Sequence, residues 1–362
     1  MPNAPAPMFS AGPIWAGSAL VVSALLTAAS IIYARRRRLI DEPGMRRSHS
    51  VPTPRGGGIG IVVAIIVCGL LPGVGTWSPV ETWFLLPPVA GIALVGWIDD
   101  HGGLSARARF AMHCAAALWT FVLPALVVAI GTPFVHQLTD TDRWLFLAVE
   151  LVTVVAVVWS INLHNFMDGI DGILALQAIF VLAVLAALEY RSSPTAPWQL
   201  VIWIAAIAAF VPFNFPRARI FMGDVGSGVV GFLIAVAVCQ QMALSDVAAA
   251  SGLVACSAFV TDATCTLLSR IWRGRRWYSA HREHLYQWLV RCGFSHARVV
   301  AFYMGWNLLI VLPVICWMNR SMPAQSGIVA AVLVYVLAVV VWIAGKRACI
   351  AAVRGRGAHA AA

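Results

Sequence analysis

Residues 144–190 read WLFLAVELVTVVAVVWSI, then NLHNFMDGIDG, then ILALQAIFVLAVLAALEY. The first and last of these pieces, residues 144–161 and 173–190, are apolar runs as long as a membrane-spanning helix. The polar island between them, residues 162–172, carries amide and carboxylate side chains. The stretch therefore predicts two membrane-spanning helices joined at one surface of a bilayer.

Apolar runs of this kind recur along the whole chain. The chain has 362 residues, of which 60% are hydrophobic, and its mean hydropathy is +0.83. A soluble domain of this size does not need so much apolar surface. Eleven runs have the length of a membrane span, and they cover residues 14–33, 59–76, 81–98, 110–130, 144–161, 173–190, 198–213, 225–243, 247–268, 299–317 and 327–345. We therefore expect an all-α, polytopic integral membrane bundle of about 11 transmembrane helices, with residues 1–362 forming a single membrane domain.

The basic residues predict the orientation of this bundle, because cytosolic loops carry an excess of Lys and Arg. With the N-terminus outside, all 25 basic residues fall on the cytosolic side except Arg143, Arg191 and Arg320. The C-terminus is then cytosolic too. Arginines 35–38 follow the first apolar run, which is a stop-transfer pattern and not a cleavable signal. Topology and anionic lipid head groups thus account for the net charge of +10, and we expect no nucleic-acid partner.

A third of the acidic residues gather in three polar islands. The chain has fifteen Asp and Glu residues, and five of them are Asp99, Asp100, Asp168, Asp171 and Asp224. The expected topology puts all three islands at the cytosolic surface. Carboxylates are costly at a membrane boundary unless they bind something. Together with glycines they suit a magnesium ion and phosphate chemistry.

The first two islands also have structural interpretations. Asp99 and Asp100 could simply end the third span, although two adjacent carboxylates repel each other and the negative end of a helix. A nearby cation would resolve that conflict. Residues 162–172 could form an ordinary Asx turn. However, their polar side chains recur at every third residue, which keeps them on one side of a helix. These side chains are Asn162, Asn165, Asp168 and Asp171.

The third island begins the eighth span at Asp224. As a structural feature this residue would be a simple N-cap. Free backbone N–H groups at a helix N-terminus also form a natural phosphate site, and glycine and serine follow at 226–228. Phe221 could stack on a nucleotide base or anchor the chain at the membrane interface.

The two longest inside loops, residues 34–58 and 269–298, are basic. The first carries arginines together with His49, and these suit pyrophosphate recognition as well as topology. The second interleaves basic and aromatic residues, which is typical of a segment that lies on a membrane surface. Its His281 and His284 could bind a sugar phosphate or could be interfacial histidines. Their spacing does not match a zinc site.

Taken in chain order, five motifs resemble those of the polyprenyl-phosphate N-acetylhexosamine-1-phosphate transferases. The motifs are Asp41–His49 with Pro52–Gly57, Asp99-Asp100, Asn162–Gly172, Asn214–Ser227 and Ser279–Gln287. The resemblance covers nearly the whole chain. It implies a bundle of transmembrane helices with a shallow cytosolic active site. It also implies an activity that moves a sugar 1-phosphate from a UDP-sugar to a polyprenyl phosphate, with magnesium as cofactor and UMP as product.

The resemblance also implies roles for single residues. Asp99 and Asp100 match the acidic pair tied to the lipid phosphate, Asp224 matches the magnesium ligand, and His284 matches the first histidine of a His-rich loop. These four are the expected catalytic residues. The expected substrate-binding residues are Asn162, Asn165, Asp168, Asp171, Asn214, Phe221, His49, Arg55, Arg107 and Arg282. Loops 34–58, 99–109, 162–172, 214–224 and 269–298 would together form the active site, with Mg²⁺, or Mn²⁺ in its place, as cofactor.

Two departures from the family pattern bear on the substrate. Tyr286 and Gln287 replace two histidines of the His-rich loop, and Arg107 stands where many members have Lys. The altered loop resembles members that serve O-antigen and lipopolysaccharide synthesis, a branch of cell wall biogenesis. We expect a UDP-N-acetylhexosamine donor, an undecaprenyl phosphate acceptor and a multi-pass location in a bacterial inner membrane. A homodimer is a further expectation.

Two other classes of membrane protein remain as alternatives. A transporter or flippase of lipid-linked sugars would place charges and broken helices near the bilayer midplane, whereas these carboxylates fall at predicted span ends. A CDP-alcohol phosphotransferase also uses aspartate-rich motifs. Its pattern of Asp-Gly, Ala-Arg and two further aspartates is absent after Asp168.

Overall fold

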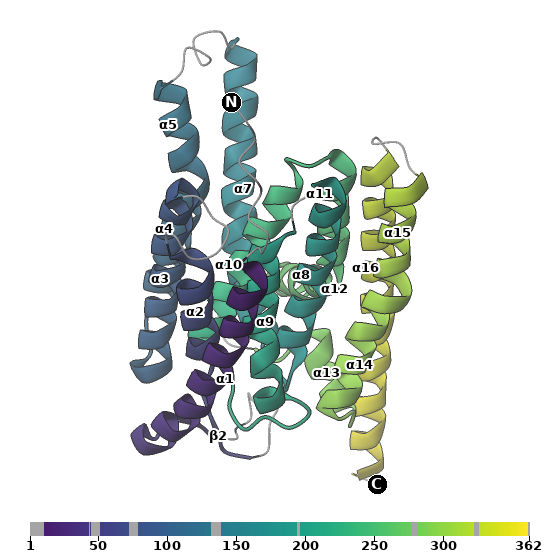
Figure 1. The fold of residues 1–362 in the computed structure, drawn as a ribbon. Coiled ribbons are helices and arrows are strands. Elements are labelled where there is room, and N and C mark those ends of the chain that lie inside the picture. The colour runs from purple at the N-terminus through teal and green to yellow at the C-terminus, as the bar shows by residue number, and fades with distance from the viewer. Residues whose placement is uncertain are drawn as a thin grey trace.

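Helices dominate the computed structural model, which describes residues 11–42, 44, 51–71, 79–131, 139–193, 196–276, 281–321 and 326–360 (Figure 1). In chain order the helices are α1 (Gly12–Arg37), α2 (Gly58–Ile65), α3 (Pro79–Gly102), α4 (Ala106–Ala117), α5 (Leu123–Gly131), α7 (Asp140–Met167), α8 (Ile173–Ser192), α9 (Trp198–Asn214), α10 (Asp224–Gln241), α11 (Asp246–Ala255), α12 (Ser257–Trp272), α13 (Leu285–Arg291), α14 (His296–Trp306), α15 (Leu312–Ser321) and α16 (Ser326–Ala360). Three π-helical turns continue α2, α4 and α14, and they are η1 (Ile66–Leu70), η2 (Leu118–Val122) and η3 (Asn307–Val311).

Most of these helices suit a membrane. Within the described residues, eight helices are long and apolar enough to cross a bilayer, and the pair α11 and α12 makes a ninth if it counts as one span. Two shorter apolar helices, Gly58–Leu70 and Trp198–Asn214, coincide with the second and seventh expected runs. The prediction of an all-α, polytopic membrane bundle is therefore confirmed. The number of helices that cross the bilayer stays a prediction.

The expected span over residues 247–268 is not one straight helix. The chain bends by 64° between α11 and α12. At the break, the Cys256 N–H donates to the carbonyl of Leu253, so one bond of the regular i→i−4 ladder is replaced by a tighter one. The Trp306 indole on α14 donates to the Ser257 hydroxyl at the same point (3.1 Å). The sequence has no proline here that would indicate a bend. The length of the apolar run therefore predicts a continuous span.

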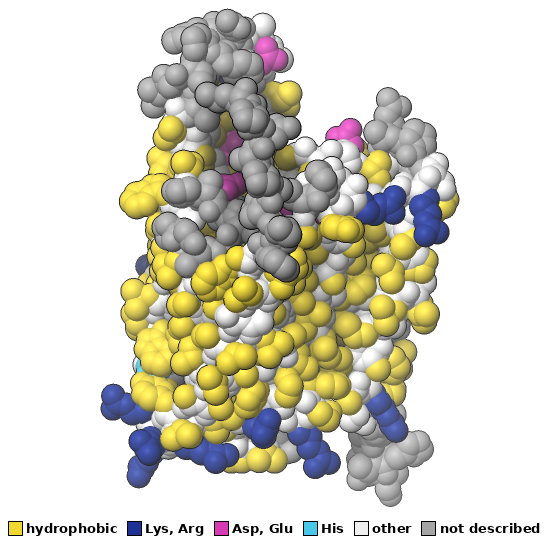
Figure 2. Space-filling view, viewed as in Figure 1, with side chains coloured by type: hydrophobic (Ala, Val, Ile, Leu, Met, Phe, Trp, Pro, Cys, Tyr) yellow, Lys and Arg dark blue, Asp and Glu magenta, His cyan; other side chains and the backbone are white. Residues whose placement is uncertain are grey.

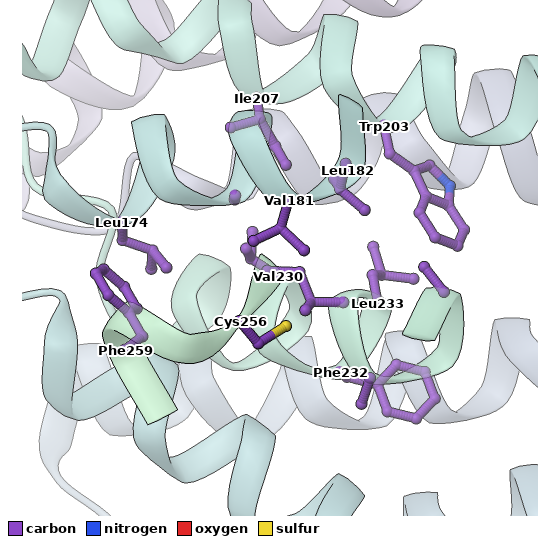
Figure 3. Close-up of a cluster of buried hydrophobic side chains, with 14 of the residues drawn as sticks. Leu174, Val181, Leu182, Trp203, Ile207, Val230, Phe232, Leu233, Cys256 and Phe259 are labelled. Carbon is purple, nitrogen blue, oxygen red and sulfur yellow. The ribbon is translucent and has the colours of Figure 1, made fainter. Parts of the chain in front are cut away.

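Helix α10 lies at the centre of the bundle. It packs against α2, α3, α7, α8 and α11, and nearly all of its residues are buried. The hydrophobic cluster around it draws side chains from α8, α9, α10 and α12, including Val181, Trp203, Val230 and Phe259 (Figure 3). Because α10 is packed on every side, its first residues have a fixed position at one end of the bundle.

Small residues allow the close packing between α2 and α10. A Cβ placed on Gly58 would lie 2.4 Å from the Cα of Gly226, and a Cβ on Gly226 would lie 2.7 Å from the Cα of Gly58. Backbone atoms cannot yield as a flexible side chain can. The two helices therefore touch through their backbones, as small residues allow in membrane bundles.

Replacing Gly58 by Ala is expected to destabilise the bundle by roughly 1–3 kcal/mol, because the added methyl group overlaps the backbone of α10. The measurement is the midpoint of thermal unfolding in detergent. Gly17→Ala is the matched control, because nothing lies within 4 Å of a Cβ at that exposed position on α1. Equal midpoints for the two variants would contradict the close packing.

The basic side chains gather at one end of the molecule. Most Lys and Arg residues on the visible face lie along its lower edge, where α1 ends in three arginines (Figure 2). The C-terminal end of α16 lies at the same end (Figure 1). So does the two-stranded ribbon of β1 (Ile40–Asp41) and β2 (Thr53–Pro54), which pair antiparallel. That this basic end faces the cytosol remains a prediction from charge.

Candidate active site

A cavity of about 200 Å³ opens among the polar islands. Every one of the five loops expected to form the site contributes at least one residue to its wall. The wall consists of Asp41, Arg55, Asp100, Asn165, Asp168, Gly169, Ile170, Asn214, Phe221, Gly223, Asp224, Ser227 and Gln287. Segments far apart in the sequence thus meet in one polar cavity.

Backbone hydrogen bonds join the first loop to the fourth. The Phe221 N–H donates to the carbonyl of Pro54 (2.8 Å), and the N–H groups of Gly57 and Gly58 donate to the carbonyls of Phe221 and Met222 (2.9 and 2.8 Å). Arg55 lies between these bonds. Its place at the cavity is therefore set by the backbone that also holds Phe221.

Asp100 fixes the beginning of α10. Its Oδ1 accepts from the Asp224 N–H and its Oδ2 from the Val225 N–H, each at 3.2 Å. A carboxylate at this place complements the positive end of the helix. Gly223 has a φ of +76°, and a Cβ there would lie 2.5 Å from the Asp100 carboxylate. The close approach of α3 to α10 therefore requires glycine at 223.

Two neighbouring helices orient the Asp224 side chain. Its Oδ1 accepts from the Asn165 amide on α7 (2.9 Å), and its Oδ2 accepts from the Arg109 guanidinium on α4 (3.0 Å). Asn165 also donates to the Ser227 hydroxyl (3.0 Å). The carboxylate is thus held in one orientation at the cavity wall.

Asp168 follows the last residue of α7 and lies near three other carboxyl groups. Among the described residues, no group donates a hydrogen bond to its carboxylate. Burial, together with the charges of Asp224, Asp100 and Asp171, raises the pKa of Asp168 to about 8. At neutral pH the Asp168 carboxyl group therefore favours its protonated form, and a bound cation would favour the ionised form.

The donor groups suit a hard divalent cation. Within the described residues, no three His, Cys, Asp or Glu side chains lie close enough to hold a metal by themselves. Magnesium does not require such a set, since it keeps several waters and binds one or two carboxylates together with substrate phosphates. The oxygen donors of Asp224 and Asp168 fit an ion of this kind, which would favour their ionised forms.

Phe221 and Asn214 line the cavity in different ways. Phe221 is partly exposed and presents its ring to the cavity. Asn214 is buried, and its amide accepts from the Gly172 N–H (2.8 Å) and donates to the Ile220 carbonyl (3.0 Å). These bonds connect the island of residues 162–172 to the loop of residues 214–224. Asn214 therefore shapes the cavity through the backbone around it.

Two members of the three-residue repeat do not reach the cavity. The Asn162 amide donates to the Val158 carbonyl (2.7 Å) and contacts the His113 ring on α4 (3.2 Å). The Asp171 carboxylate pairs with the His296 ring at the start of α14 (3.2 Å). Only Asn165 and Asp168 of the repeat line the cavity.

The expected catalytic residue His284 is buried and does not line the cavity. Its Nδ1 is 3.9 Å from the Asp262 carboxylate, and its ring stacks on Tyr286 with centroids 5.7 Å apart. Burial lowers the pKa of His284. Gln287 reaches the cavity instead. Its amide donates to the Tyr286 hydroxyl (3.1 Å), which donates in turn to the Phe166 carbonyl (3.0 Å).

Two arginines lie beside the carboxylates: the expected Arg55, whose Nε is 3.9 Å from the Asp100 carboxylate, and Arg109, which was not expected. Arg107 is exposed on α4, whereas Arg109 contacts the carboxylates of both Asp99 and Asp224. Asp99 lies outside the cavity wall and also accepts from the Leu104 N–H. Arg282 is partly buried and does not line the cavity. The expected phosphate ligand His49 lies outside the described residues.

Sequence reasoning did not assign Arg109 or Gln287 to the site, and it considered Ser227 only for its backbone N–H group. Helix geometry indicates that Arg107 and Arg109 cannot both face the site, although it does not say which of them does. The Ser105 hydroxyl accepts from the Ala108 N–H and caps α4, so the helix begins just after Ser105. Residues 107 and 109 are about 200° apart on a helix, and only one of them can face α3 and α10.

Comparison with known proteins agrees with the motifs. Residues 82–241 match the family described as Glycosyl transferase family 4. The chain is 31% identical over 327 residues to a decaprenyl-phosphate N-acetylglucosaminephosphotransferase of Mycobacterium tuberculosis, covering 78% of each chain. It is 24% identical over 324 residues to the undecaprenyl-phosphate alpha-N-acetylglucosaminyl 1-phosphate transferase of Escherichia coli O157:H7, covering 84% of this chain and 83% of that protein.

A third relative comes from Bacillus subtilis. It is a probable undecaprenyl-phosphate N-acetylglucosaminyl 1-phosphate transferase, 22% identical over 292 residues, and the match covers 77% of this chain and 79% of that protein. These matches extend well beyond the polar islands and follow the bundle along most of its length. The chain therefore belongs to glycosyl transferase family 4, the group of polyprenyl-phosphate N-acetylhexosamine-1-phosphate transferases.

Proposed function

We propose that the protein transfers an N-acetylhexosamine 1-phosphate from a UDP-sugar to undecaprenyl phosphate, releases UMP and so begins a lipid-linked glycan. One observation carries the proposal. Asp100, Asp168 and Asp224, from three distant segments, meet an aromatic ring and an arginine in a single cavity at the basic end of a membrane bundle. The names of the relatives supply the polyprenyl phosphate acceptor and the sugar phosphate.

The reaction is a phosphoryl transfer that needs little proton chemistry. An oxygen of the polyprenyl phosphate attacks the phosphorus attached to the sugar, and the bond from that phosphorus to the UMP oxygen breaks. The attacking phosphate oxygen is already anionic near neutral pH. The site therefore has to position two anionic groups in line and offset their charge.

The residues of the cavity divide this work. Asp224 and Asp168 would hold a magnesium ion, which offsets the charge of the pyrophosphate when bound. Asn165 keeps the Asp224 carboxylate in place, and Asp100 fixes the start of α10 through two N–H groups. The Phe221 ring offers a stacking surface for the uracil. Arg55 is about one-third exposed, its Nε lies 3.9 Å from the Asp100 carboxylate, and it would offer positive charge to a phosphate oxygen.

The location of the carboxylates favours an enzyme over a transporter. Asp100 lies in the last turn of α3, Asp168 follows the end of α7, and Asp224 begins α10. All three are at helix ends, whereas transporters bind their substrates near the bilayer midplane. With the basic end in the cytosol, the cavity would face cytosolic nucleotide sugars in a bacterial inner membrane.

Release of UMP tests the proposal directly. The purified protein, in detergent with undecaprenyl phosphate, is incubated with Mg²⁺ and one labelled UDP-sugar from a panel that includes UDP-N-acetylglucosamine and UDP-N-acetylgalactosamine. We expect UMP and a labelled lipid to appear in equal amounts, and only when the lipid phosphate is present. Chelation of Mg²⁺ should stop both. Absence of UMP release with every donor of the panel would contradict the proposal.

A further inference from the structure

One arginine stands where the cation of the proposed function would bind. The Arg109 Nη1 atom contacts Oδ2 of Asp99 and lies 3.0 Å from Oδ2 of Asp224. The two carboxylates thus share one nitrogen atom of the same guanidinium. A single guanidinium therefore separates two anionic groups that would otherwise repel.

We infer that Arg109 is a built-in counter-ion of Asp224, which a divalent cation has to displace before it can bind there. The inference rests on the proposed function, because it takes Asp224 to be the ligand of the cation. It goes further by making one residue of this chain the competitor of that cation. Binding of the cation and release of Arg109 are then a single event.

Both oxygens of Asp224 are already occupied. Oδ1 accepts from the Asn165 amide (2.9 Å), and Oδ2 accepts from Arg109. The Asn165 amide is neutral and is also tied to Ser227 (3.0 Å), so it can stay beside a bound cation. Arg109 carries a permanent positive charge. A divalent cation and a guanidinium cannot share one carboxylate oxygen without strong repulsion, so Arg109 is the group that must leave.

The Arg109 side chain has room to leave. Its exposed fraction is 35%, whereas Asp99 is 13% exposed and remains within reach as a partner. The residue lies in the first turn of α4, whose start is fixed by the Ser105 cap. The side chain can therefore swing away while the helix stays in place. Once released, its guanidinium is free to bind an anionic oxygen in a bidentate manner.

The same helix offers a matched control. Arg107 lies two residues earlier, carries the same charge and is exposed. It makes no contact with Asp99 or Asp224 among the interactions described. Removing the charge at 107 changes the net charge of the protein just as removing it at 109 does. Only the second change frees an oxygen of Asp224.

Binding of Mn²⁺ to the substrate-free protein tests the inference without any activity assay. The purified protein is titrated with Mn²⁺, and the free ion is counted by its electron paramagnetic resonance signal. Arg109→Gln is expected to bind Mn²⁺ about tenfold more tightly than the unaltered protein, because one charge-assisted bond to the carboxylate is lost. Arg107→Gln should stay within about twofold, the effect of a distant surface charge. The Mn²⁺ affinity of Arg109→Lys should lie between those of these two variants, since lysine keeps the positive charge but lacks the planar guanidinium with its paired N–H donors.

If Arg109 had only a structural role, its loss would leave the Mn²⁺ affinity unchanged or weaken it, whereas displacement of a counter-ion predicts a gain. Equal Mn²⁺ affinity in the Arg109 and Arg107 variants, or weaker binding in Arg109→Gln and Arg109→Lys, overturns the inference. Asp224→Asn separates this failure from that of the proposed function. If Asp224→Asn abolishes Mn²⁺ binding while the Arg109 variants bind as before, only the role of Arg109 is overturned. If Mn²⁺ binding persists in Asp224→Asn, the cation site at Asp224 is overturned as well.

Discussion

Replacing Asp224 by Asn is expected to lower sugar phosphate transfer by about 1000-fold or more, the size of effect seen when a key electrostatic group of an active site is removed. The amide keeps the shape of the side chain and loses the charge that a cation needs. The fold should survive, because the Asp224 carboxylate sits beside Asp99 and near Asp100 and Asp168. Removing one of several like charges relieves repulsion.

Two measurements check this expectation. UMP release reports transfer, and the thermal unfolding midpoint in detergent reports the fold. Asp246→Asn is the matched control, because that exposed aspartate lies in the first turn of α11, away from the cavity. Asp100→Ala should lose transfer as well, but with a lower unfolding midpoint, since the N–H groups of Asp224 and Val225 lose their acceptor. Near-normal turnover of both site variants would rule out the proposed scheme.

Replacing Asp262 by Ala is expected to cost roughly 3–5 kcal/mol of stability, because a buried carboxylate with several donors is removed. Its Oδ1 accepts from the Leu285 N–H (2.7 Å) and the Trp342 indole (2.9 Å), and its Oδ2 accepts from the Tyr303 hydroxyl (2.6 Å) and the Tyr286 N–H (3.3 Å). These bonds link α12 to α13, α14 and α16. Their loss leaves four donors without the acceptor that holds α13 to the bundle.

The loss should extend to transfer. Helix α13 carries Gln287 to the cavity wall, so a loosened α13 removes one wall of the site. The unfolding midpoint and UMP release are measured together on the same preparation. Asp262→Asn retains one carbonyl oxygen as an acceptor and should lose less of both. An Ala variant with an unchanged midpoint would show that α13 is held by other contacts.

Much of the site could be predicted from the sequence because its chemistry is concentrated in a few polar islands. A carboxylate at the boundary of an apolar run is costly, so Asp100, Asp168 and Asp224 stand out without any structural knowledge. The uneven distribution of Lys and Arg among the loops predicted that these aspartates lie at one end of the bundle. In the structure they line one cavity. The helices were equally visible, since a span needs about 20 apolar residues.

What could not be predicted depends on the rotation of helices and on contacts between distant segments. A step of three residues turns a helix by about 300°, so each repeat drifts by about 60° from the one before. Asn162 has therefore turned toward α4, and Asp171 lies beyond the end of α7, where it meets His296. The choice between Arg107 and Arg109 has the same origin. The bend at Cys256 lies inside an apolar run without proline, so composition does not reveal it.

The hydrogen bonds from Gly57 and Gly58 to Phe221 and Met222 have a consequence for how the protein is made. The ribosome completes residues 51–58 long before residue 221 exists, and membrane insertion proceeds from the N-terminus. The backbone bonds that join this loop to Phe221 and Met222 therefore form only after more than half of the chain has been made. The cavity can be completed only after α10 and, with Gln287, α13 have been synthesised, so it is among the last parts of the protein to form.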